Sequence, residues 1–137
     1  MAKFKIVFLL VFFSLCFQTA YCQTYKFSTS GFSVLEKDEK GKWGKWSDLD
    51  LVTLLVKLDT DKNRIVIYSQ AIQLFEIVDY HPIEENENDR IHSFTCKDTN
   101  GEDCTISIIT RKKQDNRKQL YINYGERIIL YNIFNYK

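Results

Sequence analysis

The sequence predicts an all-β domain: an antiparallel meander of eight or nine strands that closes into a small barrel. Short runs rich in Val, Ile, Phe and Tyr recur along residues 23–137, and clusters of polar turn residues separate them. No apolar stripe of three helical turns accompanies these runs. Because many successive hairpins leave sheet edges that must be protected, such a chain closes into a barrel or folds into a β-sandwich, which is the alternative architecture.

The first 22 residues precede this domain and have the composition of a cleaved secretory signal. A basic start at Lys3 and Lys5 is followed by an almost wholly apolar run over 6–17, and Ala20 and Cys22 put small residues at the −3 and −1 positions of a cut. The apolar run is shorter than the roughly 20 residues of a membrane span. We therefore expect cleavage after residue 22 and a secreted or periplasmic domain.

Cys22 allows a second interpretation of this leader. A lipoprotein signal is cut before its cysteine, which then carries the lipid anchor. Such signals favour a small residue just before the cysteine, whereas Tyr21 is large. Cleavage after Cys22, without lipid, is the favoured interpretation.

Length and charge limit the partners of the domain. The 137 residues include 19 basic and 18 acidic side chains, and removal of the two leader lysines leaves 17 basic side chains, a net charge of −1. A nearly neutral domain argues against nucleic acid as a partner. No second apolar run is present, so we expect no integral membrane span. The length of the chain that remains after cleavage suits one compact domain, over residues 23–137.

The first strand is expected to contain a bulge. Tyr25 and Phe27 alternate with polar residues, and after Gly31 the apolar residues continue in the opposite phase. A glycine at such a phase change is typical of a β-bulge. The charged segment Glu36–Lys42 is the turn that follows.

Segments 51–58 and 64–70 are expected to form the next hairpin. If Leu58 pairs with Ile65, the loop consists of the four residues Thr60–Asn63, and its last residue tolerates a left-handed backbone. This register sets the apolar positions of both segments against one another.

A strand over 72–80, with a phase change that indicates a bulge or bend, precedes an acidic loop. The segment His81–Arg90 contains the only proline and the acidic run 84–89. Calcium loops need fixed oxygen spacing and a turn glycine, which are missing here, so a solvated loop is the prediction. Two more hairpins follow, the second with Gly125 at its corner.

The cysteine hairpin carries a geometric prediction. A three-residue loop, Thr99–Gly101, with Gly101 in the left-handed position, puts Cys96 directly opposite Cys104. Cβ atoms of such facing residues lie about 4.5–5.5 Å apart and can approach the roughly 3.8 Å of a disulfide. An even pair of cysteines in an exported domain favours that bond.

Zinc is the alternative use of these cysteines, with His92 and His81 as further ligands. His92 and Cys96 lie about 13 Å apart along one strand at roughly 3.3 Å per residue, too far for one ion without a bend. We therefore expect no metal site.

No catalytic or cofactor motif is present. The chain lacks a Gly-x-Ser-x-Gly turn, a phosphate-binding loop and a His-Glu-x-x-His segment. Asp48 and Asp50 flank one residue, as paired acids do in glycosidases, but a turn before the next strand explains them. We expect neither catalytic residues nor a cofactor.

Trp43 and Trp46 are the candidate ligand-binding residues. Two tryptophans beside a glycine can present flat faces to a sugar, a peptide or an apolar ligand, or they can cap one end of a barrel. Capping is the simpler of these two interpretations.

Two resemblances bear on the class of protein. Gly41-Lys42-Trp43 resembles the Gly-x-Trp opening of lipocalin-type (calycin) barrels, although there the motif lies on the first strand. Residues 23–27, 43–47 and 64–69 resemble a group of short exported bacterial proteins of unknown function. This second resemblance implies export and one small domain, and it supplies no functional residues.

These observations favour an exported, non-enzymatic binding domain. The first version is a calycin-like carrier of a small apolar ligand. A secreted protein-interaction or inhibitor module, or an envelope component, is the alternative, and an enzyme is the third choice. Strands that carry apolar residues on both faces can line a lumen or fill a core. Only the structure therefore distinguishes a carrier from a filled barrel.

Overall fold

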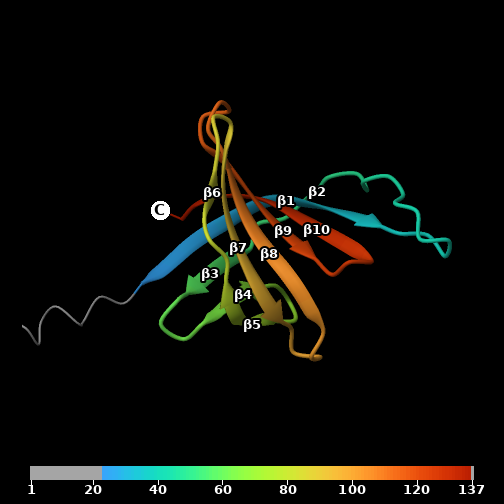
Figure 1. Ribbon diagram of the computed structural model, residues 1–137, viewed down its shortest axis with the longest axis horizontal. Helices are drawn as coiled ribbons and strands as arrows, with labels where there is room; N and C mark the ends of the chain where they lie inside the picture. The colour runs from blue at the N-terminus through green and yellow to red at the C-terminus, as the bar shows by residue number, and fades with distance from the viewer. Residues whose placement is uncertain (1–22, 137) are drawn as a thin grey trace, which may run out of the picture.

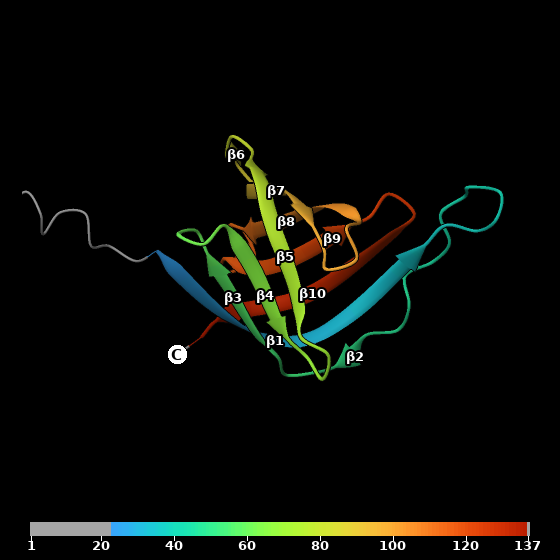
Figure 2. The same ribbon diagram turned by 90° about the horizontal axis from the view of Figure 1, so that it is seen from below.

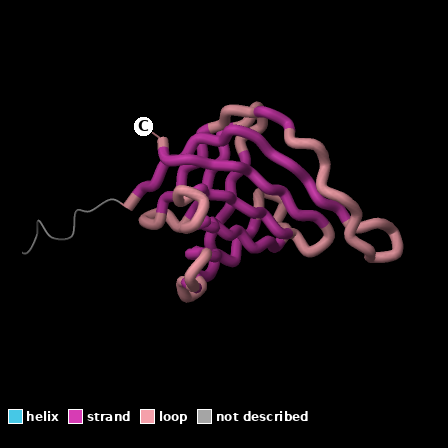
Figure 3. Tube along the Cα trace, turned by 90° about the horizontal axis from the view of Figure 1, so that it is seen from above, coloured by secondary structure: helices cyan, strands magenta, loops and turns pink. Residues whose placement is uncertain are grey.

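The computed structural model describes residues 23–136; the predicted leader over residues 1–22 lies outside them. The described chain is built of strands, turns and loops (Figure 3). Its strands are β1 (Thr24–Glu36), β2 (Asp50–Leu51), β3 (Leu55–Asp59), β4 (Arg64–Tyr68), β5 (Gln73–Tyr80), β6 (Glu84–Glu85), β7 (Asp89–Lys97), β8 (Asp103–Arg111), β9 (Arg117–Asn123) and β10 (Arg127–Asn135). Between residues 23 and 136 no helix is long and apolar enough to cross a membrane.

Eight of these strands form a closed antiparallel barrel. Neighbours follow the order β1-β3-β4-β5-β7-β8-β9-β10, and β10 pairs back onto β1 from Phe27↔Asn135 to Glu36↔Arg127. Figure 2 shows these strands wrapped around a common interior. The predicted barrel is thereby confirmed, and the two extra strands, β2 and β6, pair outside the closed ring.

β1 closes the barrel because it is long enough to serve two neighbours. Residues 24–28 of β1 pair with β3 and residues 27–36 pair with β10, so β1 crosses the molecule as one long diagonal strand (Figure 1). The register with β10 shifts between Thr29 and Gly31, which confirms the predicted bulge. A Cβ atom on Gly31 would lie 3.0 Å from the Asp50 carbonyl oxygen, so glycine allows the close approach of β2 without a shift of its backbone.

The expected strand over residues 51–58 is wrong in extent, because Thr29 interrupts it. The Thr29 hydroxyl donates to the Val52 carbonyl oxygen at 2.7 Å and accepts from the Leu54 amide at 2.8 Å. These backbone groups are therefore bonded to β1 through a side chain. The segment divides into β2 and β3 as a result.

The hairpin of β3 and β4 has the predicted register. Leu58 lies opposite Ile65, and Asn63 at the end of the loop has a φ of 51°. In β5 the apolar interior positions are Phe75 and Ile77, and the register with β7 shifts just after Ile77. The strand therefore contains an irregularity, but it falls at Val78 and not at the predicted phase change between Leu74 and Phe75, where the register with β4 is regular.

The acidic segment is not wholly a loop. Glu84 and Glu85 form β6, which pairs with Ile91 and Arg90 of β7. Glutamate has a low strand propensity, but Glu85 accepts ion pairs from Arg90 and Lys112, and these offset that preference. The expectation of a solvated loop over His81–Arg90 is corrected for these two residues and for Asp89 and Arg90, which begin β7.

The turn between β7 and β8 matches the prediction and also recurs elsewhere. Cys96 pairs with Cys104, Gly101 has a φ of 80°, and the Asp98 carboxylate accepts the amides of Asn100 and Glu102, each at 2.9 Å. The segment 38–42 repeats this hydrogen-bonding pattern, with an aspartate first and a glycine fourth. Both segments read Asp-x-x-Gly, so one local motif builds two turns.

The hydrophobic core fills one end of the barrel. Hydrophobic side chains that are at most 1% exposed come from six strands: Val56, Ile65, Ile67, Phe75, Cys96, Ile106, Leu120 and Ile122. The most buried positions fall on every second residue at the core ends of β7 and β8, and in β9 the outward Gln119 is buried as well. Toward the other end the same interior phase carries polar residues, and the barrel opens there.

Candidate functional site

A cavity of about 1080 Å³, named here the mouth cavity, opens to solvent at this second end of the barrel. Its floor is the top of the hydrophobic core, formed by Phe27, Leu58, Phe94, Ile108 and Ile133. The first residues of β1, β7 and β9 and the last residues of β3, β5, β8 and β10 surround the opening. A cavity of this size can hold a small organic molecule.

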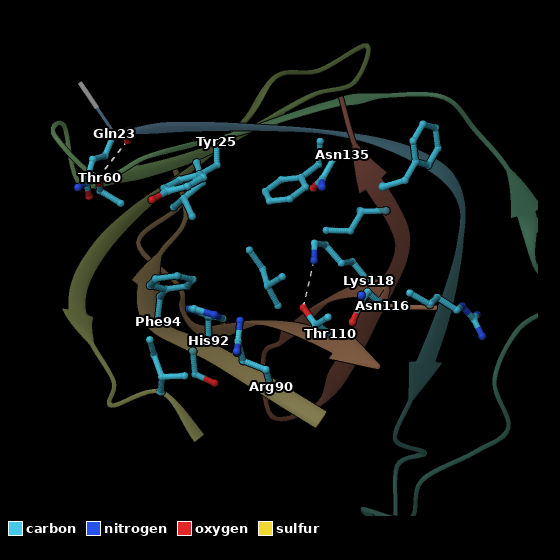
Figure 4. A pocket seen from close by; sticks show the side chains of 18 of the residues that line it. Gln23, Tyr25, Thr60, Arg90, His92, Phe94, Thr110, Asn116, Lys118 and Asn135 are labelled. Atoms are coloured by element: carbon cyan, nitrogen blue, oxygen red, sulfur yellow. Dashed lines mark hydrogen bonds between the residues drawn. The ribbon is translucent and has the colours of Figure 1, made fainter. Parts of the chain in front are cut away.

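One side of the mouth cavity is polar and basic. Arg90 of β7 pairs with Thr110 of β8, and Thr110 pairs with Lys118 of β9, so these three side chains form one row across adjacent strands. His92 lies one layer deeper on β7, beside Ile108. Each lies in the same alternating phase as the core residues of its strand, which is why each points inward (Figure 4).

The charge of Arg90 is compensated by an acidic partner. Its guanidinium donates to Glu85 at 2.9 Å, and Lys112 approaches the same carboxylate oxygen at 2.6 Å. These bonds, first from Lys112 and then from Arg90, lower the pKa of Glu85 below its usual value. Arg90 and Glu85 are well exposed and Lys112 is partly exposed, so the cluster orders the rim of the cavity more than it stabilises the fold.

Lys118 has no such partner. Its ammonium group donates to the Thr110 hydroxyl at 3.3 Å, and no carboxylate lies within ion-pair distance of it among residues 23–136. Asp115 lies on the rim of the cavity, in the turn between β8 and β9, and is exposed. The inward side of the cavity therefore holds an uncompensated positive charge.

His92 responds to this charge. Burial lowers the pKa of its imidazole below the ordinary value of 6.5, and the positive charges of Arg90 and Lys118 lower it further, while Glu85 opposes them. The ring is thus neutral at pH 7. It offers one N–H donor and one acceptor at the depth where the polar side meets the apolar floor.

Aromatic side chains line the side of the mouth cavity opposite Arg90, together with the polar residues Gln23, Thr60 and Asn135 at the rim. Tyr25 of β1 lies across the opening from Arg90 (Figure 4), and Tyr80 packs edge-on against Phe94 with ring centroids 5.6 Å apart. Tyr25 and Tyr80 are nearly half exposed, and Phe134 on the rim is 52% exposed. Exposed rings around an apolar floor provide contact area for an apolar ligand.

The predicted ligand-binding residues Trp43 and Trp46 do not line this cavity. They lie in the long loop between β1 and β2, which projects from the side of the barrel (Figures 1 and 2), and each is 43% exposed. Lys37 lies over the Trp43 ring at 4.8 Å, and Trp46 contacts the outward-facing Tyr121 of β9 edge-on at 6.5 Å. They pack on the outer wall, and ligand binding by them stays a prediction.

Cys96 and Cys104 face each other as predicted but are free thiols in the structure. Both are buried in the core end of the barrel. Burial raises the pKa of Cys96 to about 12 and that of Cys104 to about 11, so both stay protonated. The predicted register is confirmed, and the disulfide itself stays a prediction.

The other candidate metal ligand, His81, lies apart from the cysteines. Its Nε2 lies 2.6 Å from the Thr95 hydroxyl on β7. Within residues 23–136, no three His, Cys, Asp or Glu side chains come together as metal ligands.

The inward-facing basic residues escaped the sequence analysis, although the sequence contains a signal for them. Lys118 shares its phase with Leu120 and Ile122, and Thr110 shares its phase with Ile108. A polar residue in phase with core positions, at the end of a strand, indicates the rim of an open barrel.

Fold and site together define the class of protein: a closed eight-stranded antiparallel barrel with a solvent-open cavity at one end. Compared with known proteins, the chain matches no protein-family model, no curated protein and no solved structure. The argument for function therefore rests on the geometry of the mouth cavity.

Proposed function

We propose that this protein is an exported, non-enzymatic binding domain that carries a small apolar ligand in the mouth cavity. The observation that carries this proposal is the cavity itself, about 1080 Å³ in volume and open at one end only of a barrel whose other end is packed. A barrel that served only as a stable scaffold would fill both ends with side chains.

The lining supports an apolar ligand. Phe27, Leu58 and Ile133 form an apolar floor, and exposed tyrosines at the rim supply further contact area. Burial of a ligand against these groups is favourable by roughly 25 cal/mol for each Å² of apolar surface removed from water. The polar row at one side would fix the orientation of the ligand.

Binding of N-phenyl-1-naphthylamine, a neutral apolar fluorophore, tests the proposal. Thr110→Trp fills the cavity from the inner face of β8, and Thr105→Trp places the same ring on the outer face of that strand. We expect the fluorophore to bind the unmodified protein and Thr105→Trp, and to lose at least tenfold in affinity on Thr110→Trp. Equal binding by both variants would place the ligand elsewhere and refute the proposal.

The proposal includes export. All strands of the described chain follow residue 22, so cleavage there would leave the whole barrel intact. Intact-mass analysis of the protein recovered from its host tests this point. A chain that begins at Gln23 is expected; a chain that begins at a lipid-modified Cys22 would establish the anchored alternative, and an uncut chain would contradict export.

An oxidised cysteine pair belongs to the same proposal. Cys96 and Cys104 occupy facing positions, and an oxidising compartment would favour a bond between them. The bond would lock the register of β7 against β8. Its loop is short, so its stabilising effect is modest, about 2–3 kcal/mol in the chain-entropy description.

A protein-interaction module is the second candidate. Leu74 and Val78 are exposed on the outer face of β5, and Tyr68 is exposed on the neighbouring β4. Exposed apolar side chains of this kind favour contact with another protein. If this alternative is right, replacing Leu74 and Val78 by Lys would abolish the capture of a protein partner from envelope fractions. If the carrier proposal is right, the same replacement would leave the set of captured proteins unchanged.

A further inference from the structure

We infer that the ligand of the mouth cavity is an amphiphilic monoanion, whose carboxylate binds Lys118 and His92 while its apolar body lies against the floor and the tyrosines. This inference rests on the proposed function, because it names the chemistry of the ligand in that same cavity. Two independent features carry it: a lysine with no acidic partner, and the separation of the basic row from the aromatic lining.

The first feature is the position of Lys118. Thr110 is its only hydrogen-bond partner among the described residues, and a hydroxyl cannot neutralise its charge. A lysine free to reach bulk water would gain little from an anion, but Lys118 is partly buried and lies in phase with Leu120 inside the barrel. An anion bound there would make a charge-assisted hydrogen bond in surroundings of low dielectric constant, where such bonds are strong.

The second feature is the arrangement of the lining. Arg90, Thr110 and Lys118 form one row, with His92 below it, and Tyr25 lies on the opposite side (Figure 4). A molecule that is charged at one end and apolar at the other satisfies both sides at once. A wholly apolar molecule would leave Lys118 desolvated without a partner, which costs free energy.

The charge balance selects a single negative charge. Arg90 is already held in an ion pair by Glu85, which also binds Lys112, and Asp115 on the rim would repel a second negative charge. Lys118 is therefore the one side chain of this row that carries a positive charge without an acidic partner. The guanidinium of Arg117, which also lines the cavity, donates to the neutral side chains of Gln114 and Asn132. A carboxylate matches the charge of Lys118, whereas a phosphate monoester carries a second charge at pH 7.

Three naphthalene derivatives of matched shape test the inference by titration calorimetry: 2-naphthoate, the neutral 2-naphthamide, and 2-naphthyl phosphate. We expect 2-naphthoate to bind the unmodified protein at least tenfold more tightly than the amide, equivalent to about 1.4 kcal/mol. Lys118→Gln should reduce this preference to about twofold. Lys113→Gln, an equal change of charge on the exposed turn between β8 and β9, should leave it unchanged.

The outcomes separate this inference from the proposed function. Equal binding of acid and amide would refute the anionic head group and leave the apolar carrier intact, whereas no binding of any derivative would refute both. Tighter binding of the phosphate than of the carboxylate would refute the single charge. Should Lys118→Gln lose its β-sheet circular dichroism spectrum, His92→Gln replaces it, and an unchanged preference in that variant would contradict the inference.

Discussion

Asp98 is expected to be the most important residue of the turns at the closed end of the barrel. Its carboxylate accepts the amides of Asn100 and Glu102, each at 2.9 Å, and the Tyr124 hydroxyl at 3.0 Å. Asp38 accepts two equivalent amides in the matching turn but has no tyrosine partner among the described residues. The two aspartates thus form a natural pair of test and control.

The magnitude follows from the number and surroundings of these bonds. Loss of a side-chain cap of two exposed amides costs about 1 kcal/mol, so Asp38→Ala should lower the free energy of unfolding by that amount. Asp98→Ala also leaves the half-buried Tyr124 hydroxyl without its acceptor, and we expect a total of about 2–3 kcal/mol. With a urea m-value near 1.3 kcal/mol/M, the unfolding midpoint falls by about 2 M for Asp98→Ala and by less than 1 M for Asp38→Ala.

The dependence on pH gives this prediction a second readout. Burial acts to raise the pKa of Asp98, but the amides of Glu102 and Asn100, the Tyr124 hydroxyl and the charge of Arg127 together hold it below the ordinary value of 3.8. A lowered pKa in the folded state means that the ionised carboxylate stabilises the fold above pH 3.8, and that this contribution disappears as the pH falls through the lowered pKa. The difference in the free energy of unfolding between the unmodified protein and Asp98→Ala should therefore become smaller only in that acidic range.

Urea unfolding followed by far-ultraviolet circular dichroism measures these midpoints. A Tyr124→Phe variant and the double variant complete a cycle, in which we expect a coupling free energy of about 1 kcal/mol between Asp98 and Tyr124. Equal midpoints for Asp98→Ala and Asp38→Ala, or no coupling in the cycle, would refute the reasoning.

Three further predictions concern the core, the cysteines and the mouth cavity. Leu120→Ala removes a fully buried side chain and should cost about 3 kcal/mol of unfolding free energy in the same assay; a loss below 1 kcal/mol would mean that the core is not packed as described. The protein recovered from its host should have an intact mass two hydrogens below that of the reduced chain. In the reduced folded protein, Cys96 and Cys104 should react slowly with iodoacetamide at pH 8, because their raised pKa values keep both thiols protonated. Fast labelling of the folded protein would contradict the burial of the two thiols. The pKa of His92 is lowered by burial and by the charges of Arg90 and Lys118, against the opposing charge of Glu85, and binding of 2-naphthoate should raise it. The affinity for 2-naphthoate should therefore increase as the pH falls from 7 to 5.5. An affinity that does not change in this range would show that the anion does not approach the imidazole.

Local rules were sufficient to predict the hairpins. Four-residue and three-residue loops fixed the facing pairs Leu58↔Ile65 and Cys96↔Cys104, because loop length determines which residues face each other in an antiparallel ladder. The glycine at position 31 likewise marked the bulge of β1. In each case the signal lies within a few residues of the structure that it predicts.

Features that depend on distant contacts were not predictable in the same way. Thr29 splits a strand that lies more than twenty residues further along the chain, and Trp46 packs on Tyr121 across the outer wall. The phase of Lys118 with Leu120 places it on the inner face, but its position beside an open cavity becomes evident only when closure by β10 and β1 defines an interior. Closure depends on pairing between the two ends of the domain, and no local pattern encodes that register.

Native mass spectrometry of the protein purified from its own host tests the central claim most directly. If the mouth cavity carries a small molecule, the folded protein should show an added mass that is released on unfolding and is absent from Thr110→Trp, in which the cavity is filled. A folded protein that never carries an added mass, or one that retains it equally in Thr110→Trp, would contradict the claim that this barrel is a carrier.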